Sequence, residues 1–269
     1  MIKTLLSAVA LFWVAAVPLP AQSDIGTPAT GEILSGWVRS DGSRMAAFKI
    51  TLAPGWKTYW RSPGDAGIPP QFDWSRSTNL RGAEITWPAP RVFTQNGIRT
   101  IGYKDQLILP IAITPHHSGK PVTLRTKLDI GVCKDICLPY QLQLTATLDT
   151  PTTKPTPAIA AALAARPYSA AEAGLRSATC TLRPNATGLE IETHLTLPAL
   201  GGQEVVLIEP GQPDLWMSET DTRRTGQQLV ATGDLVPYGE GPLDLDHSGI
   251  VITVLGKNNA VEIKGCTPG

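Results

Sequence analysis

Charged residues are scarce in this chain of 269 residues: they make up 17% of it, against about 25% in an average protein. The 23 basic and 23 acidic side chains cancel, and lysine and arginine form no run. A protein that binds nucleic acid usually carries a basic excess or a basic face, so the composition argues against that class. Hydrophobic residues reach 42%, which is enough for packed cores and excludes a wholly disordered chain.

Long helical patterns are also rare, whereas turn-forming residues are abundant. Glycine occurs 25 times and proline 24 times, above their combined average of roughly 12%. Phe48, Ile50 and Leu52 alternate with their neighbours in the period of two that is typical of a half-buried strand. Residues 250–255 and 260–263 flank a Gly-Lys-Asn-Asn turn and predict a hairpin. These patterns disfavour an all-helical protein and predict an all-β fold of two sandwiches in tandem.

Only one stretch of the chain is strongly apolar over a long distance. Lys3 precedes an apolar run from Leu5 to Val17, and a Pro-Leu-Pro-Ala segment follows it. This layout predicts a secretory signal peptide over residues 1–21, and the run is short for a membrane span; the alternative is an N-terminal membrane anchor. We expect no transmembrane segment in the mature chain and export to an oxidising compartment, where cysteines pair.

The composition changes near the middle of the chain, which predicts the domain boundaries. We expect a first β domain over residues 28–149 and a second over 178–269. Residues 150–177 are rich in proline and alanine, and they predict a linker that contains one short helix, near residues 158–165.

The chain has only four cysteines, and three pairings of them are possible. Their positions favour Cys133 with Cys137, and Cys180 with Cys266. Strand periodicity on both sides of the segment 133–137 places the first two on the polar face of a hairpin, directly opposite each other. Opposed residues of an antiparallel pair are close enough for a disulfide, and we expect this bond to be reachable from solvent.

The two predicted disulfides differ in what they contribute to stability. The bond between Cys133 and Cys137 closes five residues and contributes about 2 kcal/mol, whereas the bond between Cys180 and Cys266 closes 87 residues and contributes about 4–5 kcal/mol. A short, exposed bridge is also the easier one to reduce. We interpret the first pair as redox-active and the second as structural. The alternative for the first pair is an inert clasp of the hairpin.

Several segments resemble one family in the same order along the chain. The resemblance is to the N-terminal periplasmic domain of the thiol:disulfide interchange protein DsbD and its ScsB-type relatives, over about residues 30–150. The segments that carry it are Gly55-Trp56-Lys57-Thr58-Tyr59-Trp60, Pro63-Gly64-Asp65-Ala66-Gly67, Pro69-Pro70, Trp74, residues 102–110, and Cys133 and Cys137 with Pro139.

This resemblance implies an immunoglobulin-like sandwich whose two cysteines, Cys133 and Cys137, cycle between disulfide and dithiol. It implies that Cys137 forms the mixed disulfides, and that residues 91–98 form a cap loop in which Phe93 is the candidate shield. It also implies a periplasmic location, a membrane electron donor of the DsbD or CcdA type, and thioredoxin-like or disulfide isomerase proteins as partners. Two features depart from the pattern: three residues separate the cysteines instead of five, and the cap's acidic pair has no clear counterpart.

No residue set in the sequence predicts a cofactor or a metal site, since the adjacent His116 and His117 lie on a polar turn and point in different directions. The assignment as an enzyme stays open. The alternative is a non-catalytic periplasmic binding or chaperone-like accessory module, in copper stress or cytochrome c maturation, with two structural disulfides.

Overall fold

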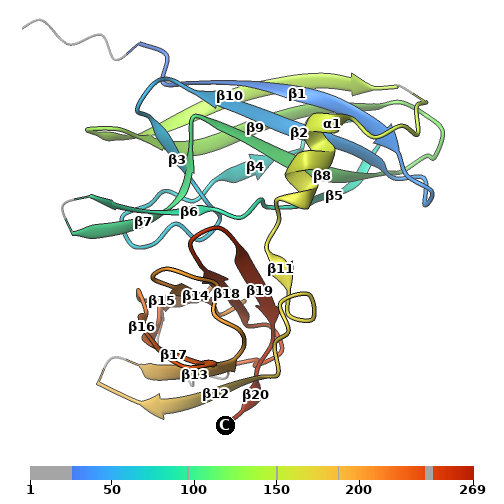
Figure 1. Cartoon of the computed structure of the whole chain (residues 1–269). Coiled ribbons are helices and arrows are strands. Elements are labelled where there is room, and N and C mark those ends of the chain that lie inside the picture. The colour runs from blue at the N-terminus through green and yellow to red at the C-terminus, as the bar shows by residue number, and fades with distance from the viewer. Residues whose placement is uncertain (1–25, 96, 150, 187, 240–244) are drawn as a thin grey trace, which may run out of the picture.

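The computed structural model describes residues 26–95, 97–149, 151–186, 188–239 and 245–269. The predicted signal peptide lies outside these residues. Within them the regular structure is almost entirely β, and one helix, α1 (Pro157–Ala164), stands between two groups of strands (Figure 1). No helix in the described ranges is both long and apolar enough to cross a membrane.

Two sheets form the first sandwich, in the upper half of Figure 1. The four-stranded sheet has the order β1-β2-β8-β5, and its strands are β1 (Ala29–Val38), β2 (Arg44–Leu52), β5 (Leu80–Ile85) and β8 (Gln106–Pro115). The six-stranded sheet has the order β10-β9-β3-β7-β6, and β4 pairs with β9. Its strands are β3 (Lys57–Tyr59), β4 (Gln71–Asp73), β6 (Arg91–Gln95), β7 (Ile98–Lys104), β9 (Val122–Cys133) and β10 (Cys137–Leu148).

The second sandwich has the same numbers of strands in its two sheets. The four-stranded sheet has the order β11-β19-β18-β14, with β11 (Tyr168–Ser169), β14 (Val205–Glu209), β18 (Val251–Leu255) and β19 (Ala260–Lys264). The six-stranded sheet has the order β15-β17-β13-β12-β20, and β16 pairs with β17. Its strands are β12 (Ser177–Pro184), β13 (Leu189–Thr196), β15 (Leu215–Met217), β16 (Asp221–Thr225), β17 (Gln228–Pro237) and β20 (Thr267–Pro268). The predicted all-β fold of sandwich domains is confirmed.

The core of the first sandwich follows from the alternation in its strands. Phe48, Ile50 and Leu52 are buried in one apolar cluster that draws on both sheets. Each fully buried side chain of this kind stabilises the fold by about 1.5–3 kcal/mol relative to an exposed one. The rings of Phe72 and Trp74 stack on Phe48 and on each other, with centroids 5.5 to 5.9 Å apart. A separate apolar cluster fills the second sandwich.

The segment between the sandwiches is attached to both of them. Helix α1 begins with Pro157 in its first turn, and its Ile159 is completely buried against Met45 and Ala47 of β2. Because Met45 and Ala47 alternate with the core residues, α1 covers the outer face of the four-stranded sheet. Strand β11 follows and pairs in parallel with β19. The boundaries 28–149, 150–177 and 178–269 remain predictions.

Two features of the first sandwich position the candidate site. Strands β9 and β10 form a long hairpin, and β10 is at the edge of the six-stranded sheet in the described part of the chain. Residues 61–70, between β3 and β4, contain no strand or helix, as their glycines and prolines predict. We call residues 61–70 the β3–β4 loop.

Candidate functional site: the Cys133–Cys137 hairpin

The tip of the β9–β10 hairpin carries a disulfide. Cys133 ends β9, Cys137 begins β10, and the two residues are directly paired, with Cα atoms 4.1 Å apart. The three residues between them are exposed, and the backbone N–H of Lys134 donates to the carbonyl oxygen of Ile136 and closes the turn. The pairing in register is the one that the alternation of the two strands predicts.

The two sulfurs differ in how well they are covered. Cys137 is exposed, whereas Cys133 is only 4% exposed. The bond can therefore be reached from solvent through Cys137, as expected, but not through Cys133. Cys133 is buried because β3 pairs with β9 at this point and Lys57 lies directly opposite Cys133. A partner sulfur can approach Cys137 more easily than Cys133.

An aromatic residue, Tyr59, contacts the disulfide. Its hydroxyl oxygen lies 3.3 Å from Cys137 Sγ. Because a disulfide sulfur has no proton, the tyrosine hydroxyl is the donor in this state. Tyr59 is only 2% exposed, and burial raises the pKa of its hydroxyl, so that the proton stays on the oxygen over a wider pH range.

Gly131 makes room for this contact. A Cβ atom at this position would lie 2.7 Å from the ring of Tyr59 and 2.6 Å from Cβ of Ile68. The missing side chain therefore lets Tyr59 lie across β9 toward β10, with Ile68 of the β3–β4 loop beside it. The hydroxyl of Thr58 donates to the carbonyl oxygen of Gly131 at 2.8 Å and ties β3 to β9.

Lys57 places a positive charge on the same face of the sheet. It is opposite Cys133, and burial lowers the pKa of its ammonium group. The ammonium nitrogen lies 5.5 Å from the ring centroid of Phe93 and donates to the hydroxyl of Thr100 at 3.3 Å. Phe93, the residue expected to shield the disulfide, is half-buried in β6 and contacts Lys57, so its role as a shield remains a prediction.

Sequence reasoning did not single out Tyr59, Gly131 or Ile68. The sequence carries a signal for Tyr59: Trp56, Thr58 and Trp60 alternate with Lys57 and Tyr59, and a period of two places these last two residues on the opposite face of the strand. Gly131 and Ile68 gave no such signal, because their contacts depend on how the β3–β4 loop folds back over β9.

The second disulfide lies in the other sandwich. Cys180 of β12 is 1% exposed and is bonded to Cys266, with Cα atoms 5.8 Å apart. This bond fixes the end of the described chain to the first strand of the sheet, where β20 pairs with β12. Its interpretation as a structural bond remains a prediction.

The fold and the paired cysteines define a class: a tandem of immunoglobulin-like sandwiches with a disulfide at the tip of one hairpin. Residues 32–149 match the family model described as "Thiol:disulfide interchange protein DsbD, N-terminal". The first sandwich therefore matches the DsbD N-terminal family over almost its whole length. No curated protein sequence matches the chain.

A solved structure shares the fold of almost the whole chain. The N-terminal periplasmic domain of ScsB from Proteus mirabilis matches with a TM-score of 0.65 and 22% sequence identity, over 90% of this chain and 92% of that one. At this identity the likeness shows the fold alone. It extends the match beyond the first sandwich to the second.

Proposed function

We propose that the chain is a periplasmic thiol–disulfide interchange protein. It passes reducing equivalents from a membrane electron donor of the DsbD or CcdA type to periplasmic thioredoxin-like or disulfide isomerase proteins. The observation that carries this proposal is the unequal pair of sulfurs, with Cys137 exposed and Cys133 buried. Exchange needs one sulfur that meets the partner and one that is held ready behind it. The family of the first sandwich and the periplasmic origin of the ScsB structure support the same function.

The exchange proceeds in two steps. The Cys137 thiolate attacks one sulfur of the partner's disulfide, a new S–S bond forms, and the partner's other sulfur leaves as a thiolate and takes up a proton. Cys133 then loses its proton and attacks Cys137 Sγ, which releases the partner's first sulfur as a thiol. Two electrons and two protons pass to the partner, and the Cys133–Cys137 disulfide forms again. The dithiol of the membrane donor reduces this disulfide by the same two steps in the opposite direction.

The measurement that tests the proposal is the reduction potential of the Cys133–Cys137 pair. We expect a value above about −300 mV, near the roughly −270 to −180 mV of thioredoxin and protein disulfide isomerase. The titration follows the two pairs separately by alkylation and peptide mapping, so that Cys180–Cys266 serves as the internal control. A potential below about −300 mV would instead mark an inert clasp and favour the accessory binding module.

Tyr59 is expected to activate Cys137. In the dithiol form its hydroxyl can donate to the Cys137 thiolate, which stabilises the charged form and lowers the pKa of the thiol. A hydrogen bond to a charged group contributes about 1.5–3 kcal/mol, so its loss raises the pKa of the Cys137 thiol and leaves less thiolate at pH 7. The thiolate that remains is more basic and therefore a stronger nucleophile, which offsets part of the decrease in rate. We therefore expect Tyr59→Phe, in a Cys133→Ser background, to slow alkylation of Cys137 at pH 7 about three- to tenfold.

The control for this prediction is Tyr103→Phe. The hydroxyl of Tyr103 donates to the carbonyl oxygen of Pro88 in the same sandwich, so this variant loses a hydroxyl of the same kind away from the sulfurs. Alkylation of Cys137 should keep its original rate there. Equal rates in all three proteins would mean that Tyr59 does not tune the thiol.

A further inference from the structure

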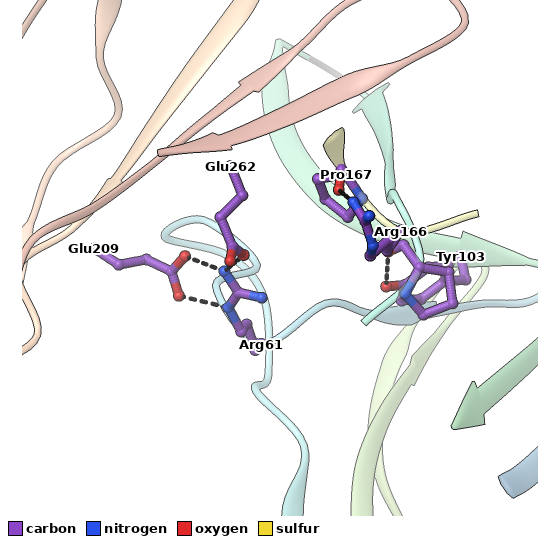
Figure 2. A network of polar contacts seen from close by, with 7 residues as sticks. Arg61, Tyr103, Arg166, Pro167, Glu209 and Glu262 are labelled. Carbon is purple, nitrogen blue, oxygen red and sulfur yellow. Dashed lines mark hydrogen bonds and ion pairs between the residues drawn. The ribbon is translucent and has the colours of Figure 1, made fainter. Parts of the chain in front are cut away.

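Arg61 joins the two sandwiches directly after the strand that carries Tyr59. Its Nε and Nη2 donate to both carboxylate oxygens of Glu209, at 2.9 and 2.8 Å, and Nη2 also donates to Glu262 at 2.8 Å. Figure 2 shows the guanidinium between the two carboxylates, which come from β14 and β19 of the second sandwich. Such charge-assisted, two-pronged bonds are among the stronger polar contacts in proteins.

Arg61 is only 25% exposed, and Glu209 and Glu262 are 21% and 25% exposed. The pairs are therefore less screened by solvent than ordinary surface ion pairs. The guanidinium carbon also lies 4.3 Å from the ring centroid of Trp60, which is completely buried in the first sandwich. Arg61 thus connects the core of one sandwich to two carboxylates of the other.

A second contact between the sandwiches supports the same region. Arg99 of β7 pairs with Glu219 at 3.1 Å and donates to the carbonyl oxygen of Thr220 at 3.2 Å. The carbonyl oxygen of Pro63, in the β3–β4 loop, accepts from the backbone N–H of Ile101 in β7. The second sandwich therefore holds the start of the loop through Arg61 and its neighbouring strand through Arg99.

The later part of the same loop packs on the β9–β10 hairpin. Ile68 packs over Gly131 beside the ring of Tyr59, two residues before the buried Cys133. Tyr59 itself precedes Arg61 by two residues and contacts Cys137. One short segment, residues 59–68, thus reaches from the carboxylates of the second sandwich to the disulfide of the first.

We infer that Arg61, held by Glu209 and Glu262, is a positioning residue through which the second sandwich controls access to the Cys133–Cys137 disulfide. The inference rests on the proposed function for its biological meaning, but not for its test. With the ion pairs formed, the β3–β4 loop keeps Ile68 and Tyr59 on the outer face of β9. When they are lost, the loop opens locally more often, and the disulfide that Tyr59 contacts through Cys137 is uncovered.

The test uses the full chain with Glu209→Gln and Glu262→Gln combined. This double variant changes no residue of the first sandwich, so any effect on the disulfide has to pass through the interface. The measured quantity is the rate at which dithiothreitol reduces Cys133–Cys137, followed by alkylation and peptide mapping. We expect the rate to rise about fivefold or more, which is the lower end of usual coupling between distant sites.

Glu204→Gln is the matched control. Glu204 forms an ion pair with Arg224 inside the second sandwich and is 5% exposed, so its loss weakens that sandwich without touching Arg61. The control should reduce at the original rate. If the double variant also reduces at the original rate or more slowly, or if the control matches the double variant, the inference is overturned.

The two proposals fail separately. The reduction potential of the unchanged protein decides the proposed function, whereas the ratio of reduction rates decides the role of Arg61. Thermal unfolding of the three proteins shows that each is folded during the measurement. A second variant, Arg61→Gln, removes the same ion pairs from the side of the first sandwich. We expect the same increase in the rate of reduction.

Discussion

In a Cys133→Ser variant, Cys137 should accumulate as a covalent mixed disulfide with its physiological partner. The exposed sulfur can still attack the partner's disulfide, but the buried residue behind it can no longer release the product. The adduct should appear as a band of higher mass in non-reducing electrophoresis of periplasmic extracts and disappear when a reductant is added. This is the largest effect that we expect from a single substitution in the first sandwich.

The reciprocal variant is the control. Cys137→Ser leaves only the sulfur that is 4% exposed, so far less adduct should form. Both variants should remain folded, because the bond closes five residues and contributes about 2 kcal/mol. If neither variant traps a partner and both lose much of their thermal stability, the pair is a clasp of the hairpin and not a reaction centre.

Loss of the second disulfide should have the largest effect on stability. Cys180→Ser removes a bond between residues 86 apart in the sequence, which restricts the unfolded chain strongly. In the chain-entropy model the free energy of unfolding of the second sandwich falls by about 4–5 kcal/mol. Urea unfolding with a probe in that sandwich measures the loss.

The reduction potential of Cys133–Cys137 serves as the companion measurement for this variant. It should stay unchanged as long as the second sandwich is folded and Arg61 keeps its carboxylate partners. A decrease in stability below about 1 kcal/mol would show that the second disulfide is not the structural bond that its long loop predicts.

The cysteine hairpin could be predicted from the sequence because its causes are local. The alternation of apolar residues on both sides of Cys133 and Cys137 sets the register of β9 and β10, and the register sets which residues face each other. The hairpin of β18 and β19 follows in the same way from its turn and its two apolar runs. Short-range periodicity is sufficient for such elements.

The burial of Cys133 and the partners of Arg61 could not be predicted in this way. The partners of Arg61, Glu209 and Glu262, lie 148 and 201 residues further along the chain. No periodic pattern relates positions so far apart. The packing of Ile159 against β2 is similar. The alternation in β2 predicts that Ala47 lies on the outer face of the sheet, and it is buried only because α1 packs over that face. Contacts of this kind depend on how whole elements come together.

The place of the disulfide at the edge of a sheet has a consequence for self-association. Strand β10 is an edge strand in the described chain, and an edge strand offers free backbone groups to which a second chain can add. Pro139 lies on this strand two residues after the exposed Cys137, and it has no N–H to donate to an added strand. When two copies come together through Cys137, their β10 strands therefore cannot form a complete set of backbone hydrogen bonds at this point. Pro139 therefore weakens this edge as a site for strand addition, two residues from the cysteine that is most open to covalent contact between chains.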